Sequence, residues 1–172
     1  MIRVLVAEDS AVTREYLVML LEEDPAIEVV GTAKDGVEAV EQAERLKPDV
    51  ITMDVHMPRM NGYEATRRIM ERVPTPIVMV SASSSRDEEF MAFEALQAGA
   101  LMVMEKPGGP DDPDYAESVR KLAETVKLMA EVKVVRRWRK RERPATPSPL
   151  HARPDRKIRL IAIGASTGGP QV

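Results

Sequence analysis

Short apolar runs alternate along the chain with longer stretches in which apolar residues recur at helical spacing. Five of these runs are rich in valine, isoleucine and methionine, do not alternate strictly with polar residues, and are bounded by charged or turn residues. Such runs are typical of strands that are buried on both faces of a sheet. We therefore predict strands at residues 3–7, 27–33, 49–53, 76–81 and 100–104.

The stretches between these strands place apolar residues three or four positions apart, as one face of a helix requires. Strands that alternate with helices predict an α/β fold, a doubly wound five-stranded parallel sheet with helices on both faces. Gly99 is placed to end one helix, and the last helix is expected to begin near Pro113 with Asp112 as its N-cap. The three apolar stripes are Tyr16, Leu17, Leu20 and Leu21; Val37, Val40, Ala43 and Leu46; and Phe90, Phe93 and Leu96.

The net charge of −3 divides unevenly along the chain. Residues 1–132 hold 26 acids and 14 bases, whereas residues 133–172 hold 2 acids and 11 bases. We predict a domain at 1–130, a basic, proline-rich linker at 131–157, and a further strand that leads into a glycine-rich turn at 158–172. The absence of cysteine excludes disulfides and thiolate metal sites and fits a cytoplasmic location. No apolar run approaches the roughly 18 residues of a membrane span.

Polar residues stand at the carboxyl ends of four predicted strands: Glu8 and Asp9, Asp54, Ser81 and Lys106. These ends meet at one edge of a doubly wound sheet. Carboxylates gathered there repel one another, and hard oxygen ligands favour Mg²⁺. Such an ion holds a phosphoryl group against a carboxylate nucleophile, while a lysine and a hydroxyl bind its oxygens. The pattern predicts an aspartate that becomes an acyl phosphate.

A plainer interpretation is that acids follow these strands because they cap the next helices. For Glu8, Asp9 and Ser10 this alternative stays open. It fits Asp54 poorly, because the helix after Asp54 is expected to begin only near Asn61.

Four stretches surround these strand ends: AEDSAVTR, MDVHMPRMNGYEATRRI, VSA and EKP. In this order and spacing they resemble the receiver domain of two-component response regulators, a flavodoxin-like fold, over residues 1 to about 130. The resemblance implies that Asp54 accepts phosphate from a histidine kinase. It also implies that Asp9 and Asp54 ligate Mg²⁺, that Glu8 assists, and that the backbone carbonyl of His56 completes the ligands.

The resemblance further implies a switch. Ser81 and Lys106 would sense the phosphoryl oxygens and shift the fourth and fifth strands with their helices. Receivers often carry an aromatic residue three positions before the lysine, but Val103 stands there, which puts the usual swing of an aromatic ring in doubt. The side chain of His56 is expected at the rim of the site. The turn at Asn61-Gly62 is expected to reverse the chain without taking part in the chemistry.

A glycine-rich turn, GASTGGP, follows the apolar run IRLIAIG. Alone, such a turn binds a phosphate at a helix N-terminus or presents a serine nucleophile as G-x-S-x-G. After a receiver and a linker, it is similar to the opening of the esterase domain in chemotaxis protein-glutamate methylesterases of the CheB type. The resemblance implies that Ser166 is the nucleophile and that methylated chemoreceptors are the substrates of the full enzyme, which is also a glutamine deamidase.

Neither histidine is a credible base for Ser166. His56 belongs to the receiver, and His151 stands in the proline-rich linker. We therefore expect a methylesterase truncated just inside its catalytic domain, which takes up phosphate but is inactive as an esterase on its own.

The basic segment 133–143, KVVRRWRKRER, carries seven bases around Trp138. A nucleic-acid-binding protein would use such arginines to contact phosphates and the tryptophan ring to stack on bases. We favour a solvated helical extension instead, because no helix-turn-helix or other nucleic-acid-binding module follows. This argues against a transcription regulator with a DNA-contacting tail. A true aspartate phosphatase is also disfavoured, because its acids stand two residues apart whereas Glu8 and Asp9 are adjacent.

Overall fold

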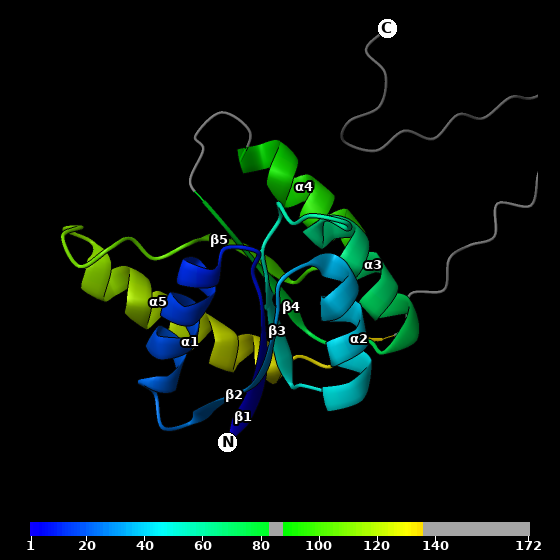
Figure 1. Ribbon diagram of the computed structural model, residues 1–172, viewed down its shortest axis with the longest axis horizontal. Helices are drawn as coiled ribbons and strands as arrows, with labels where there is room; N and C mark the ends of the chain where they lie inside the picture. Colours follow the sequence, from blue (N-terminus) through cyan, green and yellow to red (C-terminus); the bar gives the residue numbers. More distant parts are fainter. Residues whose placement is uncertain (83–87, 136–172) are drawn as a thin grey trace, which may run out of the picture. The chain divides into compact units, whose positions relative to one another are not determined.

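The computed structural model describes residues 1–82 and 88–135, in which strands and helices alternate (Figure 1). Nearly all of the predicted linker and the whole segment 158–172 lie outside the described residues. So do the side chains of Phe90, Trp138, His151 and Ser166. The elements are β1 (Ile2–Ala7), α1 (Ala11–Glu22), β2 (Ile27–Ala33), α2 (Gly36–Leu46), β3 (Val50–Met53), α3 (Gly62–Arg72), β4 (Ile77–Ser81), α4 (Glu88–Ala98), β5 (Met102–Glu105) and α5 (Tyr115–Ala130).

These five strands form one parallel sheet in the order β2-β1-β3-β4-β5. Helices α1 and α5 cover one face of the sheet, and α2, α3 and α4 cover the other (Figure 1). Each face has its own apolar core, with Leu21 and Leu122 on the first and Val40 and Ile69 on the second. All four residues of β3 are buried, which explains why its sequence does not alternate. The predicted α/β architecture is confirmed.

The helices that follow the strand-end acids are capped by other residues, Ser10 and Asn61. Ser10 is the N-cap of α1 and accepts a hydrogen bond from a backbone N–H of the first turn. Asn61 does the same for α3, at 2.9 Å. Capping therefore does not account for Glu8, Asp9 or Asp54.

The N-cap of α5 differs from the prediction. The helix begins at Tyr115, close to Pro113 as predicted, but its N-cap is Asp114 and not Asp112. The side chain of Asp112 accepts a hydrogen bond of 2.9 Å from the N–H of Asp114. An aspartate that binds the backbone two residues on forms a turn, and here the turn is completed before the helix starts.

The predicted apolar stripe of α4 is wrong in the part that the structure describes. Phe93 and Leu96 are 57% and 52% exposed, whereas Ala95 and Ala98 are buried. Small side chains let the helix lie close to the sheet, so the larger ones point outward. Gly99 ends α4 with a φ of 111°, as predicted. No helix within residues 1–82 and 88–135 has both the length and the apolar content needed to cross a membrane.

Candidate functional site

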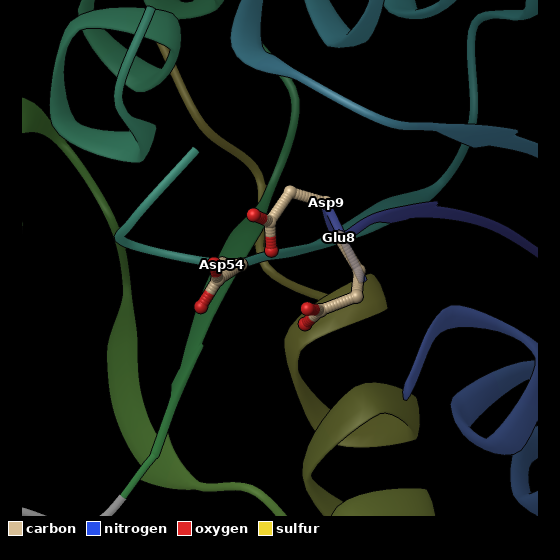
Figure 2. Close-up of side chains that lie close together, drawn as sticks. All are labelled: Glu8, Asp9 and Asp54. Carbon is tan, nitrogen blue, oxygen red and sulfur yellow. The ribbon is translucent and has the colours of Figure 1, made fainter. Parts of the chain in front are cut away.

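The carboxyl ends of the strands bring three acids together, Glu8 and Asp9 after β1 and Asp54 after β3 (Figure 2). One carboxylate oxygen from each lies within 4.8 Å of the others. The sheet fixes this arrangement, because the N–H of Asp54 donates to the carbonyl of Ala7 at 2.8 Å. We call Glu8, Asp9 and Asp54 the acidic cluster. Glu8 and Asp54 are buried, and Asp9 is exposed.

Lys106, which follows β5, bridges two members of the acidic cluster. Its Nζ lies 2.7 Å from Oε2 of Glu8 and 3.0 Å from Oδ1 of Asp54. The N–H of Lys106 donates to the carbonyl of Ser81 at 2.9 Å, which ties the ends of β4 and β5 together. Residues from four strands therefore meet at one edge of the sheet.

Burial and charge together favour the neutral form of Glu8 but the charged form of Lys106. Burial raises the pKa of the Glu8 carboxyl, and the charge of Asp54 adds to this, whereas Lys106 opposes it only in part. Burial alone would lower the pKa of Lys106, but its hydrogen bonds to Glu8 and Asp54 and the attraction of both charges outweigh burial and raise it. Lys106 therefore stays charged, while the ionised form of Glu8 costs free energy.

The raised pKa of Glu8 predicts a pH dependence of stability in EDTA. The folded chain keeps a proton on Glu8 at pH values where the unfolded chain, with a pKa near 4.5, has lost it. The contribution of Glu8 to stability should therefore fall as the pH rises from 4.5 through the higher folded value. Urea unfolding of the wild type and Glu8→Gln at several pH values measures this. The difference should shift in favour of the glutamine variant with rising pH, and a difference that stays constant would contradict the prediction.

The acidic cluster fits a hard divalent cation. Three carboxylates against one ammonium leave an excess of negative charge, and the donors are oxygen atoms, which Mg²⁺ prefers. Beyond Lys106, no described residue supplies Oε2 of Glu8 with a partner. The side chain of His56, two residues after Asp54, is exposed.

A cavity of about 490 Å³ lies beside Lys106. Val103 and Met91 line it, and it reaches Ser81, whose buried hydroxyl donates to the carbonyl of Ala82 at 3.3 Å. The position where receivers often carry an aromatic ring is thus occupied by a smaller, partly buried side chain next to open space.

Two side chains whose roles no sequence pattern indicated, Arg14 and Tyr16, hold the backbone around the site. Arg14 donates to the carbonyls of Glu8 and Asp9, at 2.8 and 3.3 Å. The hydroxyl of Tyr16 donates to the carbonyl of Gly108, just after Lys106, at 2.6 Å. Arg14 lies in the motif AEDSAVTR, but a motif does not reveal where a guanidinium points.

Comparison with known proteins gives concordant matches. The response regulator receiver domain family matches residues 4–133. Protein-glutamate methylesterase/protein-glutamine glutaminase 4 of Geobacter metallireducens is 52% identical over 100% of this chain, and its namesake of Myxococcus xanthus is 53% identical over 98%. These alignments cover 50% and 48% of the two relatives. The chain thus spans about half the length of the curated relatives it matches.

Solved structures match the same part of the chain. The response regulator domain of Thermotoga maritima CheB is 42% identical, with a TM-score of 0.68 over 77% of this chain and 98% of that one. A CheX-CheY-BeF3-Mg²⁺ complex from Borrelia burgdorferi matches with 26% identity and a TM-score of 0.60, over 72% of this chain and 88% of that one.

Proposed function

We propose that Asp54 of this chain takes a phosphoryl group from a chemotaxis histidine kinase. The chain belongs to the response regulator receiver domain family and is the receiver of a CheB-type protein-glutamate methylesterase. The observation that carries this proposal is the convergence of the acidic cluster, with oxygens within 4.8 Å of one another, on Lys106. This arrangement combines a carboxylate nucleophile, ligands for a divalent ion and a cation for the incoming oxygens.

In the proposed reaction, a carboxylate oxygen of Asp54 attacks the phosphorus of a phosphohistidine. A new P–O bond forms as the P–N bond breaks, and the imidazole leaves with the electron pair and takes up a proton. Lys106, already 3.0 Å from Asp54, neutralises charge on the phosphoryl oxygens. Mg²⁺ held by Asp9 and Asp54, with Glu8 and the carbonyl of His56, would supply the remaining positive charge.

Ser81 and Lys106 are proposed to report the phosphoryl group to the rest of the receiver. Ser81 ends β4 and Lys106 follows β5, the strands before and after α4 in the chain, and the backbone hydrogen bond between the two residues joins these strands. A movement at either residue therefore shifts β4 and β5 together. Val103 leaves a cavity beside them, so we expect this receiver to respond by moving α4 rather than by swinging a ring.

The output is proposed to be control of an attached methylesterase that removes methyl groups from chemoreceptors in the cytoplasm. The names of the relatives from Geobacter and Myxococcus support this activity for the whole protein. Ser166 is the proposed nucleophile of that domain, and it lies outside the described residues. We propose residues 1–130 as the receiver, 131–157 as the linker, and 158–172 as the beginning of the esterase domain.

Acetyl phosphate tests the proposal without a kinase. With Mg²⁺, the chain should gain the mass of one phosphate, and EDTA should reduce this gain to background, because charge on the incoming group is then no longer neutralised. Intact-protein mass spectrometry measures the gain. No phosphate uptake, or uptake that EDTA leaves unchanged, would contradict the proposal. Continuous release of inorganic phosphate would instead identify a phosphatase.

A further inference from the structure

The loop between β3 and α3, residues 54–61, is held by an ion pair outside the acidic cluster. Arg59 in this loop has a φ of 62°, in the left-handed region that residues other than glycine rarely adopt. Its Nε donates to Oδ2 of Asp35 at 2.8 Å, and its Nη2 donates to the same oxygen. The side chain of Asp35 is only 2% exposed, whereas that of Arg59 is 57% exposed.

Asp35 uses both of its carboxylate oxygens. Oδ1 caps α2 by accepting hydrogen bonds from the N–H groups of Val37 and Glu38, at 2.9 and 3.0 Å. Oδ2 accepts the bonds from Arg59. Burial alone would raise the pKa of Asp35, but the N–H of Glu38 and the guanidinium of Arg59 outweigh it and lower the pKa. A buried, charged carboxylate thus joins α2 to the loop.

Backbone contacts reinforce this connection. The N–H of Gly36 donates to the carbonyl of Met60 at 3.1 Å, and a Cβ at Gly36 would overlap that carbonyl oxygen. At the other end of the loop, the N–H of Gly62 donates to the carbonyl of Val55 at 3.0 Å. Backbone hydrogen bonds therefore hold the loop at both Val55 and Met60.

We propose that Asp35, acting through Arg59, is a positioning residue for the phosphorylation site. The ion pair fixes the loop that carries the carbonyl of His56, which the proposed function assigns to Mg²⁺ together with the carboxylate of Asp54. Partners that orient metal ligands typically change metal affinity by about 10- to 100-fold when they are removed. This inference rests on the proposed function and adds to it a residue outside the acidic cluster, the N-cap of α2.

Arg59→Gly removes the guanidinium and tolerates the positive φ, so it tests the ion pair without straining the backbone. We expect Mg²⁺ binding, measured by isothermal titration calorimetry, to weaken about tenfold. The Mg²⁺ concentration for half-maximal phosphorylation should rise equally, while the rate at saturating Mg²⁺ changes little, because Asp54 stays bonded to Ala7. Arg59→Lys, which keeps the positive charge, should recover part of the affinity.

Lys127→Gln is the matched control. It removes an ion pair of 2.5 Å with Asp24, which lies before β2 at the opposite end of the sheet. Wild-type Mg²⁺ affinity in this variant supports the inference. Wild-type affinity in Arg59→Gly, or equal weakening in both variants, would overturn it and leave the proposed function standing. A wild-type chain that binds no Mg²⁺ and takes up no phosphate would instead overturn the proposed function, and this inference with it.

Discussion

Asp54→Asn is expected to leave the chain folded and unable to take up phosphate. An amide has nearly the same shape as the carboxylate but is not a nucleophile, and removing a nucleophile lowers the rate by several orders of magnitude, to below about 1% of wild type. The backbone bond from residue 54 to Ala7 does not depend on the side chain, so the end of β3 should stay in place. Intact mass after incubation with acetyl phosphate and Mg²⁺ measures the effect, and circular dichroism verifies the fold.

Asp111→Asn is the control for this substitution. Asp111 is an exposed acid that lies in the segment before α5, outside the acidic cluster. Its replacement changes the net charge by the same amount and should leave phosphate uptake unchanged. A phosphate that still appears on Asp54→Asn would show that another residue is the acceptor.

Gly62→Ala is expected to have the second large effect. An ideal Cβ at Gly62 would overlap the carbonyl oxygen of Asp54 and lie 3.2 Å from the side chain of Met53. Since the obstructing atom is backbone, the end of β3 or the start of α3 must move. We expect a loss of about 2–3 kcal/mol in the free energy of unfolding, together with slower phosphorylation, because Asp54 is displaced.

The sign of this effect is informative. Without the contact, alanine in the first turn of a helix would stabilise the chain by up to about 1 kcal/mol, because glycine is the more flexible residue when unfolded. Gly109→Ala is the matched control, because among the described residues only its chain neighbours come within 4 Å of its added Cβ, and we expect a change within about 0.5 kcal/mol. Urea unfolding of both variants measures the difference. A Gly62→Ala variant as stable as wild type would contradict the prediction, because it would show that the end of β3 and the start of α3 move apart at little cost in free energy.

Much of the fold follows from local pattern. Both faces of β3 are buried, and its apolar run by itself predicts a strand. The α4 helix shows the limit of this reasoning. Its alanines, rather than Phe93 and Leu96, face the sheet, because the available space is set by the neighbouring elements and not by hydrophobicity alone. The N-cap of α5 was assigned to the wrong aspartate for a local reason, since Asp112 forms a turn with Asp114 instead of capping the helix.

The residue types around the site were predictable from their places at strand ends, and the distances among them were not. By itself, the sequence determined that carboxylates, a hydroxyl and a lysine follow strands of a parallel sheet. Only the tertiary structure decided that Lys106 bridges Glu8 and Asp54, that Arg59 reaches Asp35, and that Gly62 has no room for a methyl group. The physical reason is that strand spacing and helix packing set these contacts between segments far apart in the chain, whereas periodicity and charge act between near neighbours.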